Sequence, residues 1–402
     1  MNTISSLALS SLLAFGALGC RKSEPIPNPG EEQKPQAAAE STIKLGQIMP
    51  YSGPASAFGT IGKLHAAYFA KVNREGGING RKIELLSLDD SYSPPKAVEQ
   101  VRKLVEQDHV LAIFNPVGTP SNSAVQKYLN DKQIPQLFVA TGASKWNDPS
   151  HYPWTIGFNP SYALEGKTYA QEVLKANPKA KIAVLFQNDD FGKDVLAGFK
   201  EGLGAKSKQI VAEASYEVSD PTVDSQLVTL KGSKADTFID IATPKFAAQA
   251  IRKVADLRWK ADHYIVQISS SVGAVLEPAG LDKAVGLKTV AYTKDPVDPQ
   301  WANDPAMQEW RAFMKAEYPE GKLTDGANVY AYITAQTLVE VLKKCGSDIS
   351  PKNIIAQAAA IQDFAPGQLL PGIKINTSAT DFEPFDKLHL AKFDGKTWVA
   401  ID

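Results

Sequence analysis

Cysteine and histidine are scarce in this chain of 402 residues. Only Cys20 and Cys345 are present, and if Cys20 carries a lipid, Cys345 has no disulfide partner within the chain. The five histidines are scattered and form neither an HExxH motif nor another metal-ligand spacing. A GxSxG elbow is missing, and the Gly-Lys-Thr at 166–168 lacks the first glycine of a P-loop, because position 161 is serine. We therefore expect no enzyme, no metal site and no other cofactor.

An excess of one charge and long apolar runs are also absent. Lys+Arg number 43 and Asp+Glu 44, so the chain lacks the basic excess that nucleic-acid binding requires. No segment after residue 41 reaches the ~20 apolar residues of a membrane-spanning helix. Nucleic acid is therefore not an expected partner, and the membrane is expected to be reached only through a lipid anchor.

The amino-terminal segment is typical of export. Residues 1–19 carry no charged side chain, and their apolar part, about 7–18, matches the h-region of a signal peptide. The tetrad Ala17-Leu18-Gly19-Cys20 is similar to a bacterial lipobox, whose cysteine is lipidated and becomes the mature N-terminus. Ala17 stands where leucine is usual, so ordinary cleavage that leaves Cys20 as a thiol is the alternative. Both interpretations predict a protein in the periplasm or at the cell surface.

Residues 20–41 are predicted to form a flexible tether behind the lipid-attachment cysteine. Four prolines and no apolar period occur in residues 21–41, which cannot bury enough surface to repay their ordering entropy. About 360 residues remain, more than one core normally accommodates, so we expect two domains.

Short apolar stretches alternate with amphipathic ones along the rest of the chain. The pattern predicts strands at 43–48, 82–88, 110–114, 136–140, 181–186, 210–216, 236–242 and 263–268. Helices are expected at 61–77, 95–107, 121–132, 161–175, 192–203, 224–231, 245–257, 306–317 and 326–344. Asp394-Gly395 indicates a final hairpin. Repeated βα units predict an α/β fold of two Rossmann-like lobes, whose parallel sheets are covered by helices on both faces.

The loops after the predicted strands are rich in glycine, serine and threonine. They read MPYSGPASAFG, NPVGTPSNS, ATGAS, QNDDFG, ATPKF and QISSSVG. Ligands of open α/β sheets bind beyond the carboxyl ends of the strands, where hydroxyls and helix N-termini suit a small anion such as a carboxylate. Plain helix capping is the alternative for any single loop. Several such loops together favour a binding site.

From Ile43 to about Asp402 the chain resembles the type I periplasmic binding proteins of the branched-chain amino acid (Leu/Ile/Val-binding) family. The resemblance is carried by SGPASAFG (52–59), VNREGGINGRKIEL (72–85), LDD (88–90), ATGAS (140–144), NDDFGKD (188–194) and KDP (294–296). It implies two lobes joined by a multi-strand hinge, with one small ligand trapped in the cleft and delivered to an ABC importer. The lobes are expected at 42–159 plus 291–372 and at 160–290 plus 373–402.

The resemblance also implies binding residues. Hydroxyls and backbone N–H groups that hold the ligand's carboxylate in the family match Gly118, Thr119, Ala140, Thr141, Gly142 and Ser144. Phe58 and Phe191 match aromatic residues beside the ligand, and Tyr162 is expected at the rim. The family's small loop disulfide is missing, since its cysteines would fall near Tyr92 and Val117.

The ammonium end of the implied site departs from the amino-acid-binding members. Their glutamate and tyrosine match Ser269 and Thr243 here. A buried ammonium without an anionic partner is very costly, so we expect a carboxylate with an apolar body, such as a benzoate-type aromatic acid. A different alignment brings in Asp240 and keeps a branched-chain or other hydrophobic amino acid as the alternative. Lys294 is expected to be a solvated lysine at the rim, and the alternative is that it offers a cation to the ligand.

The expected partners are the small carboxylate and an ABC permease in the membrane, with the protein acting as a monomer. An alternative of another class is a ligand sensor that acts on a separate signalling partner. Permease and ATPase genes nearby would indicate transport, and a kinase gene would indicate sensing.

Overall fold

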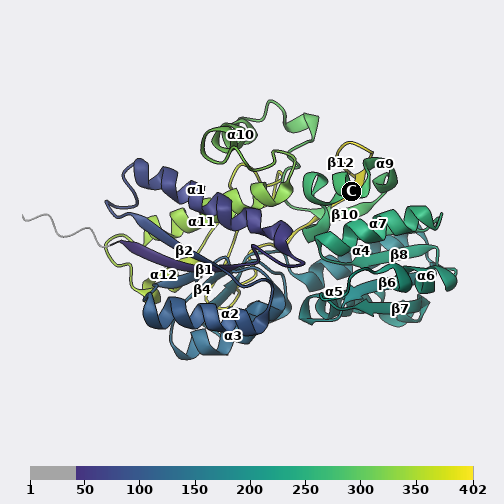
Figure 1. Cartoon of the computed structure of the whole chain (residues 1–402), viewed down its shortest axis with the longest axis horizontal. Coiled ribbons are helices and arrows are strands. Elements are labelled where there is room, and N and C mark those ends of the chain that lie inside the picture. The colour runs from purple at the N-terminus through teal and green to yellow at the C-terminus, as the bar shows by residue number, and fades with distance from the viewer. Residues whose placement is uncertain (1–41, 402) are drawn as a thin grey trace, which may run out of the picture. The chain divides into compact units, whose positions relative to one another are not determined.

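The computed structural model describes residues 42–401, and Figure 1 shows two α/β lobes within them. The export segment, Cys20 and the tether lie outside the described residues and stay predictions. Within residues 42–401, no helix has the length and apolar character needed to cross a bilayer.

The first lobe is built on a five-stranded parallel sheet in the order β2-β1-β3-β4-β5. Its strands are β1 (Ile43–Met49), β2 (Ile83–Asp89), β3 (Ala112–Phe114), β4 (Gln136–Val139) and β5 (Thr155–Gly157). Strands β1, β3 and β4 are almost entirely apolar and buried, as expected for central parallel strands covered on both faces.

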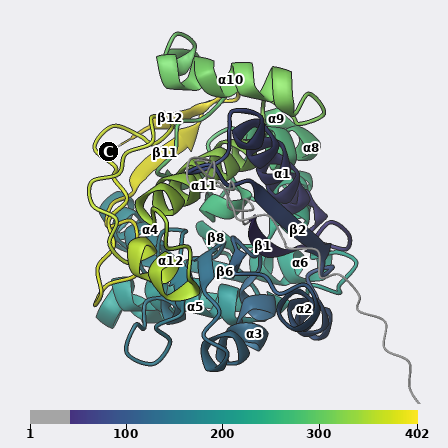
Figure 2. The ribbon, with the colours of Figure 1, turned by 90° about the vertical axis from the view of Figure 1, so that its left-hand side faces the viewer.

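Helices cover both faces of this sheet (Figure 2). On one face lie α1 (Gly59–Arg74) and α11 (Gly326–Lys344), joined in the same core by α10 (Pro305–Glu317) and α12 (Pro351–Ala358). On the other face lie α2 (Pro94–Arg102), its π-helical continuation Lys103–Gln107, and α3 (Thr119–Asp131). The helices α10 to α12 therefore return to the first lobe although the second lobe precedes them in the chain.

The second lobe has a seven-stranded sheet in the order β12-β11-β10-β9-β8-β6-β7. Its strands are β6 (Ile182–Gln187), β7 (Ile210–Tyr216), β8 (Thr237–Ile241), β9 (Asp262–Ile265), β10 (Lys288–Ala291), β11 (His389–Phe393) and β12 (Trp398–Ala400). All pairs are parallel except those of β11, which runs antiparallel to β10 and to β12. The predicted hairpin around Asp394-Gly395 is confirmed as β11–β12.

The helices of the second lobe are α4 (Tyr162–Ala176), α5 (Asp190–Leu203), α6 (Asp224–Gly232), α7 (Pro244–Asp256), α8 (Glu277–Ala279) and α9 (Leu281–Ala284). Shorter turns of helix occur across the two lobes at Ser56–Phe58, Ser144–Trp146, Gly204–Gln209, Gln267–Ser269, Val272–Leu276 and Pro299–Trp301. One apolar core holds α4 and α5 against the sheet, and another holds α6 and α7 against the opposite face.

The chain passes between the lobes three times: after β5, after β10 and before β11. The last passage lies later than the expected boundary at 373, because Phe382 and Phe385 still pack in the core of the first lobe. The other expected domain boundaries stay predictions.

The apolar pattern of the sequence does not predict every strand and helix of the structure. The stretch 263–268 was expected to be one strand, but β9 ends at Ile265 and Gln267–Ser269 turns into the space between the lobes. Strand β5 and helix α12 were not expected, since three and eight residues are too short to show a clear period.

Candidate functional site

A cavity of about 120 Å³ lies between the lobes, at the ends of β3, β4, β9 and β10. The sequence-predicted residues that line it are Phe58, Gly118, Thr119, Ala140, Tyr162, Phe191 and Thr243. Parallel strands place these loops together because their carboxyl ends meet at one edge of each sheet. The structure thus brings together seven of the eleven predicted ligand-binding residues, which come from both lobes.

Thr141 and Gly142 lie behind the cavity wall. The hydroxyl of Thr141 is 2.7 Å from the hydroxyl of Thr119 and accepts a hydrogen bond from the indole N–H of Trp146 at 3.0 Å. The carbonyl of Gly142 accepts a hydrogen bond from the backbone N–H of Tyr162 at 2.7 Å. The hydroxyl of Thr141 and the carbonyl of Gly142 are therefore already hydrogen-bonded within the protein.

Ser144 and Ser269 are likewise outside the cavity lining. Ser144 donates from its backbone N–H to the carboxylate of Asp194 at 2.8 Å. Ser269 is fully buried, and its hydroxyl donates to the carbonyl of Ala242 at 2.6 Å. The position that matches the family's glutamate is therefore a neutral side chain engaged with backbone.

Tyr162 lies inside the site rather than at its rim. Its side chain is buried, and its ring meets the ring of Phe191 edge-on with 5.2 Å between centroids. Burial raises the pKa of the Tyr162 hydroxyl, and hydrogen bonds with Thr141, Gly142 and Thr119 partly oppose that rise. The hydroxyls expected to hold a ligand's carboxylate are thus shared with this phenol.

The amino-terminal end of α3 also opens toward the cavity. Gly118 and Thr119 line the cavity, and no side chain caps this end of the helix. Gly118 has a φ of +99°, and a Cβ there would lie 2.6 Å from Cε2 of Tyr92. A residue larger than glycine at position 118 would therefore clash with the ring of Tyr92 and block this end of the helix. The partial positive charge of the helix end favours an anion.

Two charged residues line the cavity, and each has a protein partner. Lys294 was expected to be solvated, but it is only 7% exposed, and its Nζ lies 2.6 Å from Oδ2 of Asp304. The carboxylate of Asp295 accepts hydrogen bonds from the backbone N–H groups of Val297 and Trp398 and from the hydroxyl of Thr397. Burial raises the pKa of Asp295 and those hydrogen bonds lower it.

Asp240 does not line the cavity. It is buried in the sheet of the second lobe, where its Oδ2 lies 3.5 Å from Nε2 of His263. Burial raises the pKa of Asp240 above its usual range, and His263 opposes the shift. The alternative alignment that brings this carboxylate to the ligand is therefore not supported by its position.

Several cavity residues were not selected from the sequence. They are Tyr92, Asn159, Gln267, Ser270, Ser271, Tyr292, Tyr330 and Trp398. Ser270 and Ser271 belong to the quoted QISSSVG loop, and Tyr92 lies near the position of a cysteine in the family's loop disulfide. Asn159 and Tyr292 lie on segments that join the lobes, where no local pattern marks them. Asn159 and Tyr292 are recognised as cavity residues only in the folded structure, where segments distant in sequence lie side by side.

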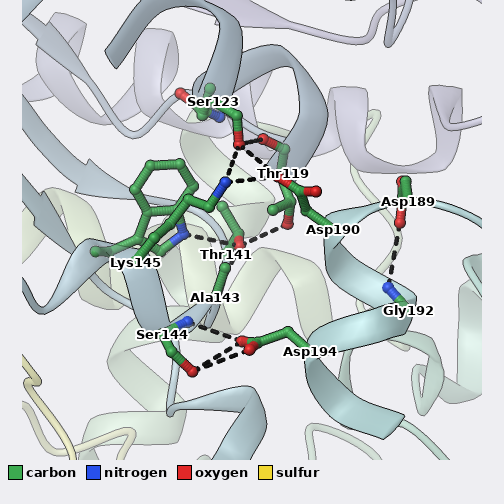
Figure 3. A network of polar contacts seen from close by, with 12 residues as sticks. Thr119, Ser123, Thr141, Ala143, Ser144, Lys145, Asp189, Asp190, Gly192 and Asp194 are labelled. Atoms are coloured by element: carbon green, nitrogen blue, oxygen red, sulfur yellow. Dashed lines mark hydrogen bonds and ion pairs between the residues drawn. The ribbon is translucent and has the colours of Figure 1, made fainter. Parts of the chain in front are cut away.

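Polar contacts join the two lobes beside the cavity (Figure 3). The Nζ of Lys145, from the first lobe, lies 2.5 Å from Oδ2 of Asp190 at the start of α5. Ser123 of α3 donates to the same carboxylate at 3.1 Å. Ser144 and Asp194 add a second bridge between the lobes. The structure is therefore a closed arrangement of the lobes.

The sequence matches a family model described as periplasmic binding protein over residues 42–397. This chain belongs to the periplasmic binding protein family. The predicted resemblance and the two-lobed α/β fold are thereby confirmed. Members of the family are exported substrate-binding proteins. Within residues 42–401, no group of three or more potential metal ligands lies together.

Known proteins similar to this chain support the same assignment. Leu/Ile/Val-binding protein homolog 7 of Brucella suis biovar 1 (strain 1330) is 22% identical over 350 residues, covering 84% of this chain and 85% of the relative. A substrate-binding periplasmic protein from Ralstonia solanacearum is 23% identical with a TM-score of 0.80, covering 89% of this chain and 100% of that one.

Two similar structures contain different ligands. A branched-chain amino acid ABC transporter protein from Thermus thermophilus, with bound valine, is 14% identical with a TM-score of 0.81, covering 90% of this chain and 96% of that one. A solute-binding protein of an ABC transporter from R. palustris, in complex with benzoate, is 22% identical with a TM-score of 0.75 and the same coverages of 90% and 96%. At these identities the likeness establishes the fold alone.

Proposed function

We propose that this protein captures a small carboxylate with an apolar body, preferably a benzoate-type aromatic acid, and delivers it to an ABC-type importer. The proposal extends the family's general role as substrate-binding proteins of transporters. It includes export, membrane attachment through Cys20 and action as a monomer, each of which stays a prediction from the sequence.

The observation that carries the ligand class is that both charged side chains in the cavity lining, Lys294 and Asp295, already bond to groups of the protein. Among the described residues that line the cavity, the one carboxylate, Asp295, already accepts three hydrogen bonds from protein groups. An ammonium group placed there would have to share this carboxylate with the three protein donors or lose its hydration without an anionic partner, which is strongly unfavourable. An amino acid is therefore a poorer fit than a simple acid.

A carboxylate and an apolar ring both find suitable surroundings. The uncapped start of α3 at Gly118 and Thr119 offers backbone N–H groups and a positive dipole end to an anion. The rings of Phe58, Tyr162 and Phe191 line the same cavity and suit an apolar or aromatic body.

Lobe closure provides the transport mechanism. Phe58 and Thr119 come from the first lobe and Phe191 and Thr243 from the second, so a ligand contacts all four only when the lobes are closed. Differential binding of this kind shifts the population toward the closed form, which the permease would recognise.

A thermal-shift screen of the purified protein tests the ligand class. Leucine, isoleucine, valine and phenylalanine would be compared with benzoate, 4-hydroxybenzoate, phenylacetate and aliphatic acids. A ligand at ~100 times its Kd should stabilise the protein by about 2.7 kcal/mol. We expect stabilisation by aromatic acids and none by amino acids. Stabilisation by valine or leucine instead would show that an anion reaches the ammonium and would overturn the proposed ligand class.

A further inference from the structure

Two buried polar atoms beside the cavity have no hydrogen-bond partner among the described residues: Oδ1 of Asn159 and the hydroxyl of Tyr292. The residues are 9% and 1% exposed, and both line the cavity. An unsatisfied buried polar group is rare in proteins and destabilises the folded state. Two of them bordering one ligand cavity therefore point to a ligand group that completes them.

Both residues lie on segments that connect the lobes. Asn159 follows β5 on the first passage between the lobes, and Tyr292 follows β10 on the second. Neighbouring phenols already have partners: Tyr330 accepts a hydrogen bond from Asn115 at 2.8 Å, and Tyr162 interacts with the Thr141 hydroxyl. Among the described residues that line the cavity, the buried side-chain atoms without a hydrogen-bond partner are those of Asn159 and Tyr292, both on the hinge side.

The chemistry of the two groups selects one kind of ligand group. The Oδ1 of Asn159 only accepts hydrogen bonds, whereas the phenol of Tyr292 both donates and accepts. Burial raises the pKa of Tyr292 well above its usual range, so the phenol remains protonated. A hydroxyl can donate to Asn159 and accept from Tyr292 at once, whereas a carboxylate cannot donate. An ammonium could donate to both groups but would have to share Asp295, the one carboxylate among the described lining residues, with three protein donors.

We propose that the ligand carries a hydroxyl group, besides its acidic group, that is bound by Asn159 and Tyr292. This inference rests on the proposed capture of a small carboxylate and makes its chemistry more specific. It adds two specificity-determining residues on the hinge side of the cavity, away from the α3 end proposed for the carboxylate.

Calorimetric titration of the purified protein with matched pairs of compounds tests the proposal. The pairs are benzoate with 3- and 4-hydroxybenzoate, and phenylalanine with tyrosine. We expect the hydroxylated member of the binding pair to have a Kd at least about tenfold lower, because a site built to bond a hydroxyl discriminates against its absence. This comparison needs no variant and is independent of any folding defect.

Tyr292→Phe then removes the hydroxyl alone. It should raise the Kd of the hydroxylated compound about tenfold and raise that of the unhydroxylated compound much less. Asn159→Ala should act in the same direction. Tyr332→Phe is the matched control, since the ring of Tyr332 packs in the core of the first lobe and its hydroxyl donates to the exposed Glu309, outside the cavity lining.

The outcomes separate the two proposals. Equal Kd values within every pair that binds, or equal weakening of both members by Tyr292→Phe, would overturn the hydroxyl inference and leave carboxylate capture standing. Preference for tyrosine over phenylalanine with no binding of the benzoates would support the hydroxyl inference and overturn the aromatic-acid assignment. Binding of none of these compounds would overturn both.

Discussion

Glu165 shows how one buried side chain supports the ligand cavity. Its Oε1 accepts hydrogen bonds from the hydroxyl of Tyr169 and from the backbone N–H of Gln267, both at 2.7 Å. Gln267 lines the cavity, so Glu165 anchors the turn that follows β9. Burial raises the pKa of Glu165 to about 7, and the two hydrogen bonds oppose that shift. The carboxyl group therefore titrates near neutrality.

The raised pKa of Glu165 predicts a pH-dependent stability. The folded protein holds the proton more tightly than the unfolded chain, so this contribution is complete below pH ~4.5 and is lost as the pH rises through about 7. Glu165→Gln mimics the protonated form. Its free energy of unfolding relative to the wild type should therefore increase between pH 5 and pH 8, as measured by urea denaturation.

The exposed Glu201→Gln is the control for this measurement, because Glu201 pairs with Lys167 at the surface. Parallel pH profiles for wild type and Glu165→Gln would show that the carboxylate is not destabilised by burial.

His65 is the opposite case of a buried titratable residue. It is fully buried, with Gln47 at 3.0 Å from Nδ1 and Thr334 at 2.9 Å from Nε2. Burial lowers the pKa of His65 to about 3, so the ring is neutral at physiological pH. It is a packed residue of the first lobe.

Helices α4 and α5 pack closely because glycines line their contact. A Cβ on Gly198 of α5 would lie 2.6 Å from the backbone of Ala163 in α4, and Gly166 and Gly202 meet backbone atoms in the same way. These helices carry Tyr162 and Phe191, whose rings meet in the cavity. The glycines thus set the distance between two elements of the site.

Gly198→Ala should therefore destabilise the protein by about 1–3 kcal/mol, since neighbouring backbone cannot yield without shifting a helix. Urea denaturation measures the effect. Gly232→Ala is the matched control, because Gly232 ends α6 and a Cβ there meets nothing within 4 Å. Equal stability of both variants would show that the α4–α5 contact adjusts freely.

At the scale of the whole molecule, binding depends on the balance between open and closed lobes. The Lys145–Asp190 pair joins the two lobes, so we expect it to favour their closed arrangement. Both side chains are more than a third exposed, so the contribution to closure is modest, about 0.2–1 kcal/mol. The ion pair contributes a small part of the free energy that favours the closed lobes, and ligand binding contributes the larger part.

Lys145→Met should accordingly raise the Kd of the ligand by roughly two- to fivefold at low salt, and less at high salt because the pair is screened. Calorimetric titration at two salt concentrations measures both effects. Lys127→Met provides the comparison, since Lys127 pairs with Asp131 within α3 and never across the lobes. A salt-dependent loss of equal size in both variants would contradict a role for Lys145 in closure.

The sequence by itself determined most of the order of the elements, the mainly parallel pairing in the two sheets, the closing hairpin and the loops that surround the ligand cavity. These follow from apolar periodicity and turn residues, which are local properties of the chain. Only the tertiary structure decided which side chains in those loops are free to meet a ligand. Thr141, Ser144 and Lys294 have the right chemistry but find partners within the protein, whereas Asn159 and Tyr292 do not. Those partners come from segments far away in sequence, so hydrogen-bond satisfaction becomes defined only when the fold brings them together.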